Sequence, residues 1–153
     1  MDYDATEFVI SERDFQLKRL EEIRTALADA RQTGNWSKVP VDVYRDYLAR
    51  IILSASPNIV EHSIVRQIDF ISAESVFTVE MSGISQNVQF EKRAEQEFQH
   101  AKRRVMQLLR AQALCCNADA VTDVQLQHTF LDSEDNRKRF LIVATGTAVE
   151  LGS

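Results

Sequence analysis

The chain has 153 residues, a length that suits a single domain with one hydrophobic core. It carries 18 Lys and Arg against 23 Asp and Glu, a net charge of −5. This balance argues against a nucleic-acid partner, because neutralising phosphates takes a concentrated basic face. The sequence does not open with a basic segment and an apolar run, and no stretch approaches the roughly 18 apolar residues of a membrane helix. We therefore expect a cytoplasmic protein that does not enter a membrane.

The first fifty residues are predicted to be helical. Ser11 offers an N-cap, and the acidic turn after it suits the helix dipole. Apolar residues then recur at helical spacing and form one narrow stripe: Leu20, Ile23, Leu27 and Ala30. Gly34 is expected to end this helix, because glycine accepts the left-handed conformation. Pro40 is expected to open a second, short helix that ends near Arg50.

From Ile51 the sequence changes to short β-like runs. Between residues 60 and 70, apolar and polar side chains alternate as on a half-buried strand, which would bury Ile64, Ile68 and Phe70. Residues 76–81 are expected to extend this strand or to form another. Residues 82–87 have the composition of a turn.

The clearest predicted element is a long helix over about residues 88–116. Its inward stripe keeps helical spacing and comprises Ala94, Phe98, Ala101, Val105, Leu108 and Gln112. Asn117 follows, and asparagine is second only to glycine in the left-handed position that ends a helix. Two strands over residues 120–130 and 139–151, joined by the polar residues 132–136, are then expected to form an antiparallel hairpin beside the helix.

Three stretches, in order along the chain, carry the motifs of a known family. The first includes Ser56-Pro57-Asn58-Ile59 and Ile71-Ser72-Ala73-Glu74-Ser75-Val76. The second includes Gln112-Ala113 and Asn117-Ala118-Asp119-Ala120-Val121, and the third ends in Gly146-Thr147-Ala148-Val149. Together they resemble the opening strand, the Gln-Ala and Gly-Ala-Asp-Ala-Val segment, and the Gly-Thr-Ala-Val strand of the YbjQ-like family, over about residues 51–151.

The resemblance implies a β-α-β-β core of the dodecin-like kind, in which an antiparallel sheet packs on one long helix. With the N-terminal helices, this predicts an α+β fold in which residues 1–50 form a helical extension and residues 51–153 form the YbjQ-like domain. The resemblance also implies a homo-oligomeric ring, typically a pentamer. Three family glycines are replaced here, by Asp69, Asn117 and Asp123. Asn and Asp are the mildest replacements for a glycine with positive φ.

Members of this family carry a heavy-metal-binding label, and soft metals such as zinc or copper favour thiolate and imidazole ligands. The chain offers Cys115, Cys116, His62, His100 and His128, without a Cys-x-x-Cys or His-x-x-x-His pair. Neighbouring helical residues point about 100° apart, so the two cysteines are poorly placed to bind one ion together. In a ring, however, one side chain per subunit can build a site around the axis. The candidate metal ligands are therefore Cys115, Cys116 and His128. The alternative is that the cysteines serve packing and the helix end, and that His128 is an exposed strand residue.

No catalytic motif is present: the sequence has no Gly-x-Ser-x-Gly elbow and no glycine-rich phosphate loop. The densest basic patch, Lys102-Arg103-Arg104, is flanked by glutamates, as on a solvated helix face. Two functions therefore remain open. The first is a homo-oligomer that binds a ligand or a metal without catalysis. The second is an interaction or scaffold module whose residues 1–50 dock a protein partner.

Overall fold

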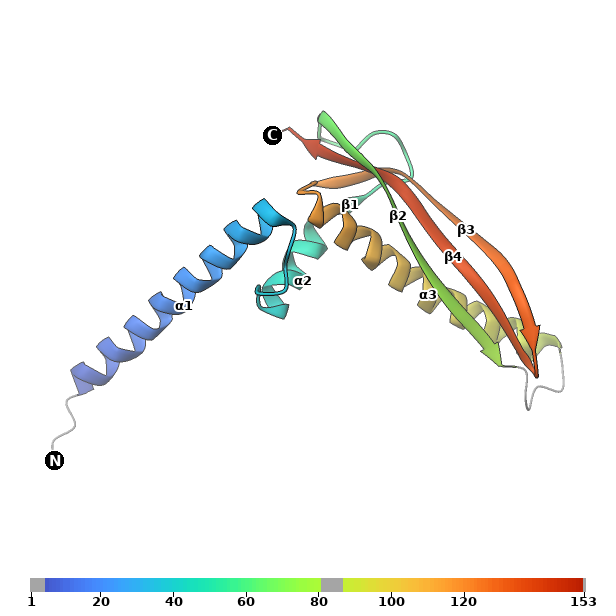
Figure 1. Cartoon of the computed structure of the whole chain (residues 1–153), viewed down its shortest axis with the longest axis horizontal. Helices are drawn as coiled ribbons and strands as arrows, with labels where there is room; N and C mark the ends of the chain where they lie inside the picture. Colours follow the sequence, from blue (N-terminus) through green and yellow to red (C-terminus); the bar gives the residue numbers. More distant parts are fainter. Residues whose placement is uncertain (1–4, 81–86, 153) are drawn as a thin grey trace. The chain divides into compact units, whose positions relative to one another are not determined.

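The computed structural model describes residues 5–80 and 87–152, with side chains from residues 12–80 and 91–152. Two compact units make up the chain, Met1–Asp46 and Tyr47–Ser153. Figure 1 shows the course of the chain through both. Among the described helices, none combines the length and the hydropathy that crossing a bilayer demands.

Two helices lie in the N-terminal part of the chain, α1 (Ala5–Thr33) and α2 (Val41–Arg50). Gly34 ends α1 as predicted: its φ is 77°, and its N–H donates to the carbonyl of Ala30 at 2.7 Å. The predicted N-cap at Ser11 is wrong, because α1 begins at Ala5. Residues 5–10 contain no glycine or proline that would stop a helix from extending through them. Pro40 directly precedes α2, and its carbonyl accepts the N–H of Tyr44 at 2.9 Å.

The second unit is an α+β fold, and its order of elements confirms the predicted β-α-β-β core. Its elements are β1 (Ile52–Leu53), β2 (Ile64–Glu80), α3 (Asn87–Cys115), β3 (Ala120–Glu134) and β4 (Arg137–Leu151). The sheet order is β1-β3-β4-β2. Strand β4 is antiparallel to β2 and to β3, whereas the short β1 runs parallel to the start of β3. Figure 1 shows α3 along one face of the three long strands.

The core forms between α3 and the sheet, mainly β2 and β4. The helix contributes a fully buried line at four-residue intervals, Ala101, Val105, Leu109 and Ala113. The predicted stripe was wrong at its end, since Leu108 is 44% exposed and Gln112 is exposed. The prediction placed a step of three residues after Val105, which leads to Leu108. The buried residues are instead four apart, and because each such step rotates about 40° around the helix, the buried line winds slowly around α3 and reaches Leu109.

Strand β2 is irregular near its start. The register with β4 shifts between Ile64 and Arg66 and again between Gln67 and Asp69. One extra residue moves the later side chains to the opposite face of a sheet, and a second moves them back, so Phe70 shares a face with Ile64. The face toward α3 instead carries Ile71 and Phe77, whose ring meets Phe98. The prediction that Phe70 is buried is therefore wrong, and this ring is 68% exposed while Ile71 is buried. Strand β2 then continues to Glu80. The predictions for Met81 and for residues 82–86 of the turn lie outside the described residues, and Asn87, the last residue of the predicted turn, is the first residue of α3.

Two of the three residues that stand for family glycines adopt the backbone conformation that glycine favours. Asn117, after α3, has a φ of 58°, and Asp123, at a register shift of β3, has a φ of 53°. Asp69 does not adopt a positive φ, but lies at the irregularity of β2. Asn117 and Asp123 thus allow the same positive φ that glycine would, at the turn after α3 and at the irregularity in β3.

The hairpin between β3 and β4 turns over two residues only, Asp135 and Asn136, whose φ values are 51° and 57°. Two consecutive positive values are typical of the type I′ turn, which matches the twist of the flanking strands. The predicted polar connection over residues 132–136 is therefore mostly strand. Arg139 Nε donates to Asp132 Oδ1 across the hairpin at 2.8 Å. This hydrogen bond lowers the pKa of Asp132.

Gly146 on β4 sits where β3 leaves no room for a side chain. A Cβ there would lie 2.4 Å from Cγ1 of the fully buried Val121 and 3.1 Å from the carbonyl oxygen of Thr122. We expect Gly146→Ala to destabilise the protein by about 1–3 kcal/mol, the usual cost of overpacking a core. Gly152→Ala is the control, because its nearest neighbour is the rotatable hydroxyl of Ser63. Urea denaturation measures both. An equal cost for the two variants would contradict the argument.

Candidate functional site

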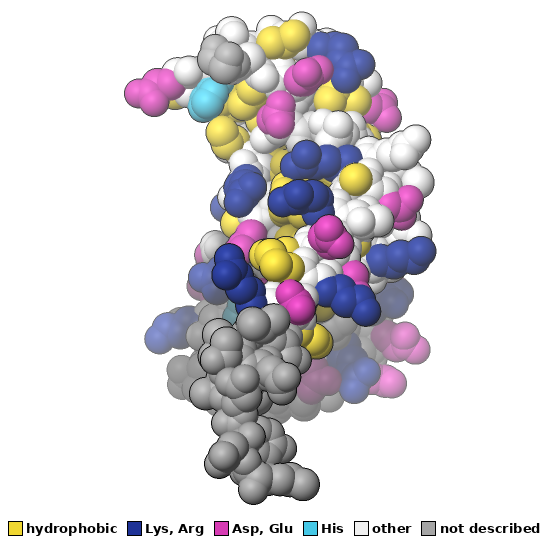
Figure 2. All heavy atoms as spheres, turned by 90° about the vertical axis from the view of Figure 1, so that its left-hand side faces the viewer, with side chains coloured by type: hydrophobic (Ala, Val, Ile, Leu, Met, Phe, Trp, Pro, Cys, Tyr) yellow, Lys and Arg dark blue, Asp and Glu magenta, His cyan; other side chains and the backbone are white. Residues whose placement is uncertain are grey.

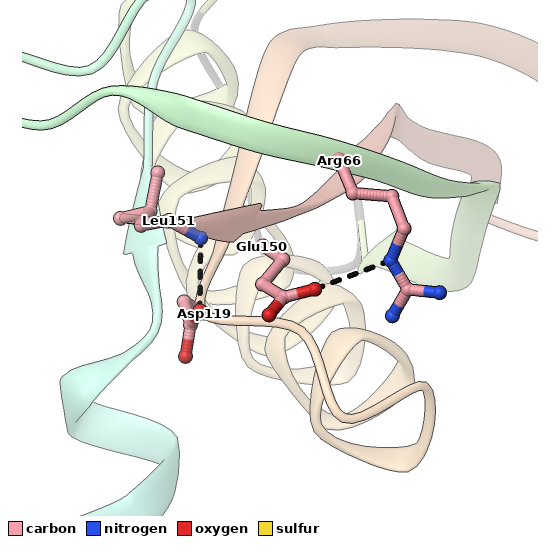
Figure 3. Close-up of polar contacts among 4 residues, drawn as sticks. All are labelled: Arg66, Asp119, Glu150 and Leu151. Carbon is pink, nitrogen blue, oxygen red and sulfur yellow. Dashed lines mark hydrogen bonds and ion pairs between the residues drawn. The ribbon is translucent and has the colours of Figure 1, made fainter. Parts of the chain in front are cut away.

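The Asp of the Ala-Asp-Ala motif ties the start of β3 to the end of β4 (Figure 3). Asp119 Oδ2 accepts the N–H of Leu151 at 2.9 Å, and its own N–H donates to the carbonyl of Val149 at 2.9 Å. Beside it, Arg66 Nε lies 3.2 Å from Glu150 Oε2 and joins β2 to β4. These polar groups close one end of the sheet, so the Asp119 carboxylate has a structural role.

The two cysteines lie at the end of α3 and are both free thiols. Cys115 is the last residue of the helix and is exposed, whereas Cys116 is half-buried. Burial raises the pKa of the Cys116 thiol, and the carboxylate of Asp69 and the neighbouring Cys115 raise it further. Because a soft metal binds the thiolate, this environment opposes metal binding by Cys116.

His128 lies on β3, far from the cysteines. Its ring meets the ring of Phe98 edge-on, with centroids 5.3 Å apart. Phe98 and Cys115 lie on the same straight helix, and their separation along α3 corresponds to roughly 25 Å. One chain therefore does not bring the three predicted metal ligands together. Across the described residues, His, Cys, Asp and Glu form no group of three that could hold a metal ion.

His128 does line a groove between the first half of α3 and the inner face of the sheet. The groove has a volume of about 380 Å³ and is lined by Phe77, Glu91, Ala94, Glu95, Phe98, His128 and Phe140. Phe77 and Phe140 stack at 5.1 Å, and Phe98 meets Phe77 edge-on at 6.1 Å. The groove thus has an aromatic floor, while carboxylates and an imidazole supply its charged and polar groups.

The groove exists because α3 covers β2 and β4 far better than it covers β3. His128 pairs across the strands with Ile142, which is fully buried, yet His128 itself is exposed. Sequence reasoning singled out His128 and placed Phe98 on the inner stripe, but it missed Phe77 and Phe140 as its neighbours. The sequence does contain a signal for the acidic residues of the groove. Glu91 and Glu95 are four positions apart, which places them together on one helix face.

The geometry defines the class: an α+β protein with one long helix on a mostly antiparallel sheet and a groove at the helix margin. A family model described as putative heavy-metal-binding, YbjQ, matches residues 51–152. The chain belongs to this family.

The similarity of this chain to a solved structure is limited. A solved structure of a protein of unknown function from Pediococcus pentosaceus ATCC 25745, which belongs to the DUF74 family, is 15% identical. The similarity covers 67% of this chain and 98% of that chain, with a TM-score of 0.46. Among curated proteins, no match was found.

The environment of Cys116 can be tested by its alkylation rate. In a Cys115→Ser background, we expect Cys116 to react slowly with iodoacetamide near neutral pH and faster as the pH rises through its raised pKa. Asp69→Asn removes a negative charge that disfavours the thiolate, so the rate profile should shift to lower pH. Glu74→Gln, a charge loss elsewhere on β2, is the control. If Asp69→Asn left the profile unchanged, Asp69 would not act on this thiol.

Proposed function

We propose that the chain is a homo-oligomeric protein that binds a ligand or a metal ion without catalysis, through its domain at residues 51–153. The observation that carries this proposal is the aromatic and acidic groove around His128. Such a concave, mostly apolar site with a few polar groups is the common form of a small-molecule site. Nothing in its lining pairs a nucleophile with a base, as far as the described side chains extend.

The sheet supports self-association because it has long open edges. Strand β1 pairs with β3 at Ala120 and Val121, and Ser54 and Ser56 extend the backbone hydrogen bonds to Val124, so the edge of β3 beyond Val124 has no strand partner within the described residues. Strand β2 is the last strand on the other side of the described sheet. Unpaired edges of this length are templates for pairing with another chain. Apolar side chains on β2 add to the surface available for association, since Phe70 and Val76 are each more than 40% exposed. The ring, with a pentamer as the expected form, rests on the family resemblance.

A metal site would have to form between subunits. Among the described lining residues, one chain contributes a single imidazole to the groove, His128, beside Glu91 and Glu95. Imidazole nitrogen and carboxylate oxygen are both ligands of zinc, and imidazole also suits copper. Symmetry-related copies would multiply this set around an axis. The single-chain groove does not by itself fit a metal, because the described residues contain no group of three ligands.

The net charge of −5 and the face drawn in Figure 2 support a partner other than nucleic acid. Figure 2 shows Lys and Arg side chains interspersed with Asp and Glu on one face of the molecule. A mixed surface of this kind lacks the continuous basic stripe that phosphate backbones attract.

Assembly and metal binding can be tested on one sample. We expect native mass spectrometry of the full chain to show a closed oligomer. After chelation, added zinc should raise the melting temperature by several degrees, since a ligand at about 100 times its dissociation constant stabilises by about 2.7 kcal/mol. His128→Asn should abolish this shift, whereas His100→Asn, an exposed histidine on α3, should retain it. A monomer without a zinc-dependent shift would contradict the proposal.

The alternative function, docking of a protein partner through residues 1–50, is favoured by one observation on α1. Leu20, on the predicted apolar stripe, is 57% exposed. The stripe becomes less exposed toward the end of the helix, where Ile23 and Leu27 are half-buried and Ala30 is fully buried. The beginning of the stripe therefore leaves an apolar surface that fits a partner helix.

This alternative predicts that Leu20→Gln removes a co-purifying protein while the melting temperature stays within about 2 °C, because exposed substitutions usually change stability by less than 0.5 kcal/mol. Phe15→Gln is the control, since this exposed ring points about 140° away from Leu20 on a regular helix. Affinity capture followed by mass spectrometry compares the two variants. Equal capture by both would contradict docking through the stripe.

A further inference from the structure

We propose that the groove around His128 binds a small organic cation with an apolar body, such as an aromatic or branched amine. This inference names the ligand class of the binding role proposed above and rests on that role. Two observations carry it. The floor of the groove is aromatic, and the charged residues among its described lining side chains are both acidic, Glu91 and Glu95.

The floor consists of rings that already hold one another in place. Phe77 is buried and stacks on Phe140 at 5.1 Å with an interplanar angle of 14°. Phe98 meets Phe77 at 67°, so the aromatic rings that line the groove lie at different angles. An ammonium group within about 6 Å of a ring face is attracted by the ring quadrupole, and the apolar body of the ligand packs on the remaining ring surface.

The acidic side comes from one face of α3. Glu91 and Glu95 are one helical turn apart, and Gln99 Nε2 donates to Glu95 Oε1 at 3.0 Å, which restrains that carboxylate. Two carboxylates beside an apolar floor favour a cation and disfavour an anion. An uncharged ligand would cover polar groups without pairing them, which costs affinity.

The dimensions select a small ligand. A volume of about 380 Å³ lies near the lower end of the range for small-molecule sites, roughly 300–1,000 Å³. One ring with a branched ammonium group suits such a space. Because the groove is lined by α3, β2, β3 and β4 of one chain, a bound cation would contact residues from all the long elements of the second unit.

The test titrates the full-length protein in EDTA, followed by backbone amide NMR shifts. The probe is benzyltrimethylammonium, with neopentylbenzene as its uncharged analogue of the same shape and phenylacetate as an anion. We expect the cation to bind about tenfold more tightly than neopentylbenzene, since a charge near two exposed carboxylates gains about that factor. Phenylacetate should bind more weakly still. The shifts should centre on His128 and the first half of α3.

Variants separate the floor from the acidic side. Glu91→Gln with Glu95→Gln should reduce cation binding to that of the uncharged analogue, and Phe98→Leu should weaken both ligands. Glu97→Gln is the matched control, because Glu97 lies on the same helix but lines a different hollow with Arg93 and Glu80. Equal binding of cation and anion, or a double variant that binds the cation unchanged, would overturn the inference.

The outcome is distinct from that of the zinc experiment. If the cation fails to bind while the zinc shift still depends on His128, the ligand class is wrong and the metal-binding role stands. If the cation binds as expected to a protein that is monomeric and does not respond to zinc, the groove is a ligand site and the assembly is wrong.

Discussion

A single helix has to cover three long strands in this fold, and it is too narrow to do so. An α-helix with its side chains is about 10–12 Å wide, whereas three strands at about 4.8 Å spacing with their side chains are wider. In length the two layers agree, since 29 helical residues span about 44 Å and 15 strand residues about 50 Å. The mismatch is therefore lateral, and it falls on β3, which α3 contacts least among the three long strands.

The main functional features of the second unit follow from this mismatch. The inner face of β3 is left open beside α3, so His128 is exposed although its cross-strand neighbour Ile142 is fully buried. The outer edge of the same strand also has no strand partner beyond Val124 among the described residues. One uncovered strand thus accounts both for the groove and for an open edge of the sheet.

The sequence was sufficient for the features that depend on local chemistry. Helical spacing predicted α3, Gly34 marked the end of α1, and the Gly-Thr-Ala-Val motif marked β4, where Gly146 is required by the approach of Val121. One error arose in choosing the buried face of a strand. Phe70 and Ile71 are both apolar and point to opposite faces of β2, so the alternation alone did not show which face α3 covers. The groove could not be predicted, because its rings come from separate strands whose register only the folded sheet defines.

The pairing of β2 with β4 also has a consequence for how the chain folds. The contact between Arg66 and Glu150 joins residues 84 positions apart, whereas the β3–β4 hairpin closes over two residues. Closing a long loop costs more chain entropy than closing a tight turn, and sheets dominated by distant pairings fold slowly. We therefore expect the hairpin and α3 to form early and β2 to join last. Until β2 is in place, one edge of the most central strand, β4, remains open to any extended segment, so the nascent chain is most exposed to mispairing at this stage.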